Sequence, residues 1–192
     1  ESVALAWRFP GLASKDFEVL QVVSQVLYNG KAGLIDLDLN QQQKVLNSYG
    51  YPMGLADYSA FILGGLPKQG QTLEEVKDLL LNEIKKLRAG EFDEKMLQAN
   101  INNFKLYELQ SMESNEGRAD IFVNSFINGT NWEDEVTAID RMAKLTKEDI
   151  VAFADKYLKE DNYAVVYKKQ GKDPNEKKMT KPEISPIVSN RD

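Results

Sequence analysis

The chain opens on Val3-Ala4-Leu5-Ala6-Trp7-Arg8-Phe9, in which large apolar residues alternate with small or charged ones. An alternation of period two is typical of a strand with one buried face, and Pro10-Gly11 ends it. Ser14 then offers an N-cap to an apolar stripe at helical spacing, which Gly30 can terminate. The first thirty residues therefore predict a strand followed by a helix that faces a core.

Two further strands are expected after this helix. A short helical piece over residues 32–44 separates them from it. The density of Gly and Pro over residues 49–55 favours strand or loop, and residues 59–67 have the composition of a strand. A turn near residues 56–58 would join the two as a hairpin.

Helices dominate the rest of the chain. Thr72 and Glu75 have the spacing of a capping box ahead of a helix that reaches residues 89–90, and Asp93 can begin another that extends to Ser114. Further helices are expected over residues 116–128 and 132–145, and after the capping signature Thr146-Lys147-Glu148-Asp149, with a last strand over residues 162–169.

This order of elements predicts the α+β class. The expected architecture is a two-layer sandwich, with an antiparallel or mixed sheet of about four strands and helices packed on one face. Residues 1–170 should form one domain. Residues 171–192 contain three prolines and little apolar content, which is typical of a linker toward a following domain.

The composition excludes several classes of chemistry. The chain contains no histidine and no cysteine, so the commonest zinc sites and the Ser-His and Cys-His nucleophile pairs are absent. A net charge of -6 argues against a nucleic-acid or anionic-membrane partner, and no apolar run approaches the length of a membrane span. The lack of cysteine suits a cytosolic, periplasmic or exported protein equally.

Carboxylates, lysines, tyrosines and hydroxyls remain for catalysis, and the carboxylates come first. A carboxylate-dependent hydrolase needs two acids about 5 to 10 Å apart in a cleft. The acids at residues 74–75, 93–94 and 133–135 stand at expected helix starts, where the helix dipole favours negative charge, so a structural role is preferred. Asp36 and Asp38 lie in the short helical piece without an evident acid partner.

A peptide groove is the main binding hypothesis from the residues themselves. Tyr51, Met53, Tyr58 and Phe61 could line it beside an exposed sheet edge, where an extended peptide would add as a strand. Gly64-Gly65 would permit the close approach of another backbone. Packing in the protein core is the alternative role for these side chains.

Three stretches carry a resemblance to a known family. They are residues 7–11 with Asp16, residues 26–34, and residues 146–158 followed by Asp161-Asn162-Tyr163 and a valine-rich strand. Together they span most of residues 3–169, and they are similar to the insulinase/pitrilysin zinc metallopeptidases. The resemblance implies the processing-peptidase type of fold, with a strand, helix, hairpin, helices and strand in that order. In active domains of that family, an H-x-x-E-H helix holds zinc.

The resemblance also implies that this domain is noncatalytic. Matching the Gly that ends the zinc helix to Gly30 places Gln21, Ser24 and Gln25 where His, Glu and His would stand. Neutral amides and a hydroxyl bind Zn²⁺ poorly. The family's third ligand, a helical Glu, should fall within residues 96–107, which contain no acid. We therefore expect no catalytic residue and no metal or cofactor in this domain.

Another family feature is missing as well. Some noncatalytic domains of the family carry an Arg and a Tyr, seven residues apart, that reach the substrate. Matching the preceding Leu to Leu39 puts Asn40 and Asn47 at those positions, so this role is not assigned to them.

As implied by the resemblance, the chain would be an inactive domain of a multi-domain zinc metalloendopeptidase. It would help to form a peptide-binding chamber and would dock on the catalytic domain of the same polypeptide, which is expected to hold the zinc. Exposed apolar patches are expected for docking, and the acidic composition suggests neutral or basic peptides as substrates. The alternative is a scaffold or assembly subunit with no protease partner. A periplasmic or cell-envelope location is implied if the source is bacterial.

Overall fold

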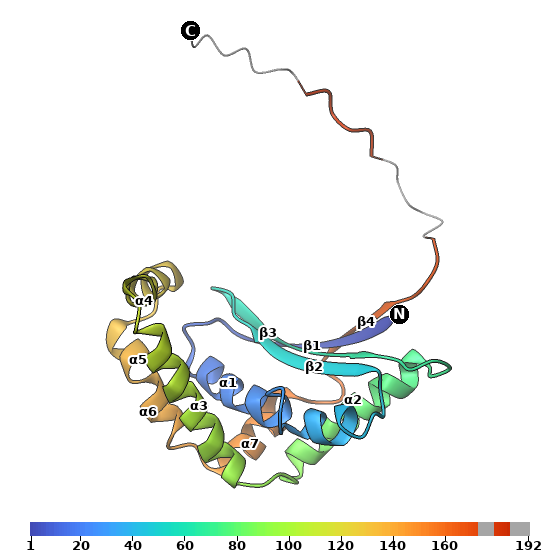
Figure 1. Ribbon diagram of the computed structural model, residues 1–192, viewed down its shortest axis with the longest axis horizontal. Coiled ribbons are helices and arrows are strands. Elements are labelled where there is room, and N and C mark those ends of the chain that lie inside the picture. Colours follow the sequence, from blue (N-terminus) through green and yellow to red (C-terminus); the bar gives the residue numbers. More distant parts are fainter. Residues whose placement is uncertain (173–178, 185–192) are drawn as a thin grey trace.

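The computed structural model describes residues 1–172 and 179–184. One four-stranded antiparallel sheet has the order β2-β3-β1-β4, and a layer of helices covers one of its faces (Figure 1). The strands are β1 (Ser2–Pro10), β2 (Asn47–Met53), β3 (Tyr58–Leu66) and β4 (Ala164–Lys168). The helices are α1 (Lys15–Leu27), the π-helical segment η1 (Asp36–Asn40), α2 (Leu73–Arg88), α3 (Lys95–Ser111), α4 (Asn115–Asn128), α5 (Trp132–Val136), α6 (Ala138–Met142) and α7 (Lys147–Tyr157).

The alternation in β1 decides which face of the sheet is covered. Its odd-numbered residues, from Val3 to Phe9, are buried against the helices, and each pairs with a residue of β3 on the same face. Trp7 is opposite Phe61, and the Trp7 indole N–H donates to the carbonyl of Lys159 beyond α7 at 3.1 Å. The predicted α+β sandwich is therefore confirmed, with a purely antiparallel sheet.

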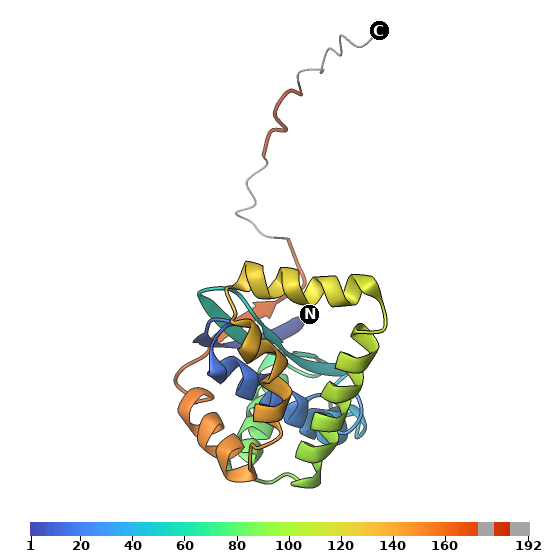
Figure 2. The same cartoon turned by 90° about the vertical axis from the view of Figure 1, so that its left-hand side faces the viewer.

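The helical layer lies on one side, with one exception. Figures 1 and 2 show α1, α2, α3 and α7 beneath the sheet, whereas α4 stands apart, raised toward the level of the uncovered face. The aromatic rings of Phe9 and Phe153 stack 5.7 Å apart and anchor α7 to β1. The last helix therefore packs on the strand with which the chain begins.

The helix starts predicted at Ser14, Thr72 and Thr146 are confirmed, and each of these side chains caps its helix. The Ser14 hydroxyl accepts from the backbone N–H of Asp16 at the start of α1. Thr72 forms the predicted capping box with Glu75, and Thr146 forms one with Asp149.

Three predicted boundaries are wrong. The expected helix over residues 32–44 is reduced to η1 and the two helical residues before it. Asp36 binds the backbone of the loop that precedes it, and Asn40 binds the backbone of Ser48 in β2. The expected helix over residues 132–145 is broken at Thr137, which has ψ near 3° and separates α5 from α6. The helix after Asp93 ends at Ser111 rather than Ser114. The expected linker over residues 171–192 lies largely outside the described residues and stays a prediction.

Candidate functional site

The three residues that the family resemblance matches to metal-binding positions, Gln21, Ser24 and Gln25, lie on α1. Ser24 is 1% exposed, whereas Gln21 and Gln25 are half-buried. The carbonyl of Ser24 accepts from the N–H of Tyr28 at 2.7 Å, and that of Gln25 accepts from Asn29 Nδ2 at 3.1 Å. These amides and this hydroxyl do not fit zinc, which prefers imidazole, thiolate or carboxylate. Among the described residues, no group of three His, Cys, Asp or Glu side chains could hold a metal ion.

Asn100 is a buried polar residue that the sequence analysis did not single out. It lies on α3, in the stretch where the family's third ligand was expected, and is 2% exposed. Its Oδ1 accepts from Asn29 Nδ2 at 3.4 Å, while its own Nδ2 has no partner within the described part of the chain. The only sequence signal is an amide between the buried Leu97 and Ile101 on one helix face.

A cavity of about 300 Å³ adjoins Gln21, between α1 and the segment from α4 to α6. Glu18, Asp134 and Glu135 contribute carboxylates to its lining. Arg141 donates to both oxygens of Glu18, from Nε at 2.9 Å and from Nη2 at 2.5 Å.

These acids do not form a catalytic pair. A hydrogen bond from Lys15 lowers the pKa of Asp134, and Arg141 lies beside it as well as beside Glu18. An acid/base pair needs one carboxyl group held protonated by a raised pKa. The lowered pKa of Asp134 is the opposite of what a general acid needs, and both oxygens of Glu18 are occupied by Arg141, so the geometry does not support the carboxylate-dependent hydrolase.

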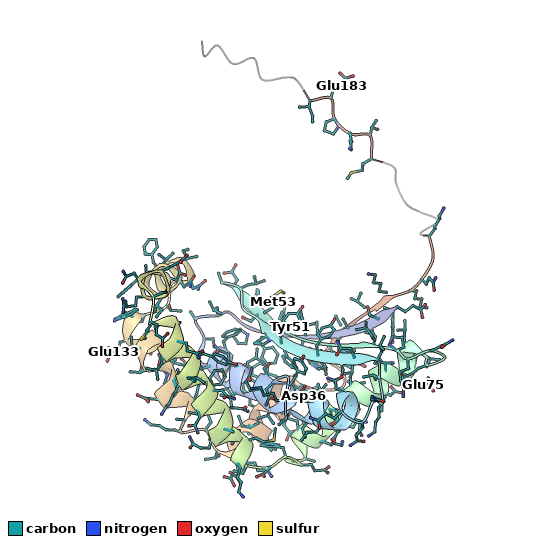
Figure 3. All side chains as sticks on the ribbon, viewed as in Figure 1. Asp36, Tyr51, Met53, Glu75, Glu133 and Glu183 are labelled. Atoms are coloured by element: carbon teal, nitrogen blue, oxygen red, sulfur yellow. The ribbon has the colours of Figure 1, made fainter. Side chains whose placement is uncertain are left out.

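Asp36 and Asp38 have structural partners. Asp36 Oδ2 accepts from the backbone N–H groups of Asn29 and Gly33, both at 3.0 Å, and so holds the loop that follows α1. Figure 3 shows Asp36 in the helical layer beneath the sheet. Asp38 pairs with Lys86 on α2, with its Oδ2 2.6 Å from Nζ.

Lys86 also serves a more deeply buried acid. Its Nζ lies 2.9 Å from Oε1 of Glu83, which is 1% exposed. Burial raises the pKa of Glu83, whereas the hydrogen bond from Lys86 lowers the pKa of Asp38. The pair of acids shares one cation across the junction of η1 and α2.

Three of the four predicted peptide-binding residues lie on the uncovered face of the sheet. Tyr51, Met53 and Tyr58 are 46%, 41% and 59% exposed. Figure 3 shows Tyr51 and Met53 on the side of the sheet away from the helices. Phe61 was wrongly included, because it points to the opposite face and is fully buried against the helices.

Strand addition at the β2 edge has little free backbone to use. The Asn40 side chain donates to the Ser48 carbonyl and accepts from the Ser48 N–H, both at 2.8 Å. In a strand, the backbone N–H and carbonyl groups of every second residue point to the same edge. After Ser48, the residues whose backbone groups point to the outer edge of β2 are therefore Gly50 and Pro52. Since proline has no N–H, Gly50 alone keeps both backbone groups there.

Gly64 and Gly65 serve the chain's own packing rather than the approach of another backbone. A Cβ on Gly64 would overlap the ring of Tyr49, and one on Gly65 would meet Val76 of α2. The predicted approach by a foreign backbone is therefore wrong at both positions. β3 is also an inner strand, with β1 and β2 on its two sides.

Comparison with known proteins supports the family resemblance. The zinc protease PqqE of Helicobacter pylori is 27% identical over 174 residues, which cover 88% of this chain and 38% of that protein. The crystal structure of a protease from Helicobacter pylori matches with a TM-score of 0.79 and 21% identity, over 85% of this chain and 40% of that one.

An inactive peptidase domain from Bordetella parapertussis matches with a TM-score of 0.74 and 17% identity, over 86% of this chain and 91% of that one. The chain thus spans under half of the Helicobacter proteins and nearly all of the isolated Bordetella domain. The family model for the Peptidase M16 inactive domain matches residues 1–104, more than half of the sequence. The chain therefore belongs to the Peptidase M16 inactive domain family.

Proposed function

We propose that this chain is a noncatalytic domain of a zinc metallopeptidase, docked on a catalytic domain and forming part of the wall of a peptide-holding chamber. The catalytic domain would hold the zinc, since the α1 residues of this chain do not fit it. Support comes from the family and from an apolar surface on α3, α4 and α5. We call it the α3–α5 surface.

The α3–α5 surface is the observation that carries docking. On α4, Phe126 is 88% exposed and Ile127 67%, with Phe122 and Val123 also exposed. Phe122 stacks on Trp132 of α5 with ring centroids 4.3 Å apart. The exposed apolar side chains assigned to this surface are Leu106, Tyr107, Leu109, Phe122, Val123, Phe126, Ile127, Trp132 and Val136.

This surface continues from α4 to α3 across α5. Leu109 of α3 and Val136 of α5 line the same surface hollow. Contiguous exposed apolar area of this kind marks interaction sites on soluble proteins. A catalytic domain covering it would remove these side chains from water and stabilise the assembly.

The test adds the 192-residue chain to the catalytic part of its polypeptide and measures association and peptide cleavage. We expect binding, and we expect Phe126→Ser/Ile127→Ser to weaken it at least tenfold, since each exposed apolar side chain buried on docking is worth about 1 to 3 kcal/mol. Leu46→Ser is the matched control, because Leu46 is 69% exposed and lies outside the α3–α5 surface. Full cleavage without the domain, and no association, would leave the scaffold role as the better account.

A periplasmic or cell-envelope location belongs to the same proposal, and fractionation of cells expressing the tagged protein tests it. In the described part of the chain, no helix combines the length and apolar character needed to cross a membrane.

A further inference from the structure

The uncovered face of the sheet has an unusual composition for a solvated surface. Its outward positions are the even residues of β1, β3 and β4 and the odd residues of β2, as the burial pattern and strand pairing require. We call this set the open face. A sheet with one solvated face normally alternates apolar inward with polar outward residues. Here most outward residues are Ala, Gly, Pro, Tyr, Ile, Leu, Met or Val, and the exceptions are Ser2, Arg8, Asn47 and Lys168.

The charge of the open face differs from that of the whole chain. None of its positions carries Asp or Glu, and its charged residues are Arg8 and Lys168. The chain as a whole has a net charge of -6. The acidic surface from which a bias toward neutral or basic peptides was expected is therefore not found on this face, and the peptide class stays untested.

The open face has a floor of small side chains near its centre and tyrosines along one side. Ala4 and Ala6 of β1 lie near the centre, opposite Gly64 and Ile62 of β3. Along the β2 side, the rings of Tyr49 and Tyr51 stack with centroids 6.1 Å apart.

The two cations stand near opposite ends of the floor. Arg8 lies over the ring of Tyr58, with Cζ 5.0 Å from the centroid, while Lys168 pairs with Ser2 at the other end of β1. Arg8 follows Ser2 by six positions along β1, which is a span of about 20 Å. An extended peptide of about six residues has the same length.

We propose that the open face binds extended peptide segments that carry apolar or aromatic side chains and acidic rather than basic flanks. The apolar side chains would lie against the tyrosines and the alanine floor, and carboxylates would approach Arg8 and Lys168. The proposal rests on the chamber role proposed above and adds the class of peptide. Along the β2 edge, Asn40 holds the backbone of Ser48 and Pro52 has no N–H, so the segment would contact the face rather than add a strand beside β2.

The test uses three labelled peptides of equal length with one aromatic and aliphatic centre, flanked by Glu, Gln or Lys. Fluorescence anisotropy measures their binding to the full 192-residue chain at low and high salt. We expect the Glu-flanked peptide to bind about tenfold more tightly than the Lys-flanked one, with a preference that salt weakens. Arg8→Glu should abolish this preference, and Arg8→Gln should reduce it.

Lys31→Glu is the matched control, since it makes the same change of charge at an exposed loop residue away from the sheet. An equal effect of Lys31→Glu and Arg8→Glu would overturn the proposal, because net charge alone would then explain the preference. A preference for the Lys-flanked peptide would also overturn the proposal, as would the absence of binding by all three peptides at millimolar concentration.

A last measurement distinguishes a peptide bound to the open face from a catalytic domain docked on it. The Met53 methyl resonance should shift on adding the Glu-flanked peptide and not on adding the catalytic domain alone. A shift caused by the catalytic domain would make the open face an interdomain contact and would overturn the peptide proposal while supporting docking. Loss of docking with peptide binding retained would instead overturn the proposed docking role and leave the peptide class standing.

Discussion

The ring of Tyr49 lies across Gly64 on the neighbouring strand, in the space that a β-carbon at position 64 would occupy. The two residues are directly paired between β2 and β3. Gly64 therefore lets the Tyr49 ring lie flat on the open face. A glycine inside a strand often marks close approach of other atoms, and here they belong to the partner strand's own side chain.

Gly64→Ala should displace the Tyr49 ring and lower the free energy of unfolding by about 1 to 3 kcal/mol, the usual cost of overpacking. Chemical denaturation measures the loss. Adding Tyr49→Ala should recover part of it, because the overlapping atoms are then gone, so the double mutant should be less destabilised than the two single changes sum to. Strict additivity would contradict the packing relationship.

Asn40→Ala should weaken the β2 edge. The change leaves the backbone N–H and carbonyl of Ser48 without their side-chain partner, at a cost of about 1 to 3 kcal/mol. Hydrogen exchange at the Ser48 amide should accelerate, and light scattering should detect edge-to-edge association because the strand edge is now open.

The control for the β2 edge is Asn47→Ala. Asn47 is exposed on the open face rather than at the edge, so its loss should cost under about 0.5 kcal/mol. Equal effects of the two variants would show that Asn40 does not protect the edge.

Local sequence patterns predicted most of the helices and strands. The wrong predictions concern features that depend on contacts between residues far apart in the sequence. The capping boxes at Thr72 and Thr146 depend on residues three positions apart, so sequence alone reveals them. Residues 58–66 carry apolar side chains on both faces of an inner strand, and the face of Phe61 follows only from its pairing with Trp7. Nothing local at Thr137 signals the break between α5 and α6.

The candidate sites were less predictable than the fold, because the role of each side chain depends on whether it is buried. Gln21, Ser24 and Gln25 could be matched to a metal motif by spacing, yet their different exposures are set by how α1 packs. Asn100 carries no charge and belongs to no motif, so its buried position facing Asn29 appears only in three dimensions.

Ser24→Glu tests whether the core still has room for a carboxylate at the position that the family resemblance matches to the water-activating glutamate. With Ser24 1% exposed, a carboxylate there would be buried without a cation, so we expect a loss of at least about 3 kcal/mol in the free energy of unfolding. Gln25→Glu, one residue along and half-buried, should cost under about 1 kcal/mol. A loss for Ser24→Glu as small as that for Gln25→Glu in urea denaturation would show that α1 could still accept a glutamate at position 24.

The acids that share Lys86 should give opposite pH dependences. Burial raises the pKa of Glu83 above its ordinary 4.5, so its ionised form costs stability at neutral pH, and that cost is relieved as the pH falls through the raised folded-state value. Glu83→Gln removes this titration. Relative to the unmodified protein, the variant should therefore lose stability, on the order of 1 kcal/mol, as the pH falls from 7 toward 4.5.

Asp38→Asn should behave in the opposite way. The hydrogen bond from Lys86 lowers the Asp38 pKa, so its contribution is present above the ordinary value of 3.8 and disappears as the pH falls through the lowered folded-state value. The variant should be less stable by about 1 kcal/mol at pH 7 and should approach the unmodified protein below that range. Denaturation curves across these pH values measure both differences. Parallel pH profiles for Glu83→Gln and Asp38→Asn would contradict the assignment of Glu83 as the buried acid and Asp38 as the paired one.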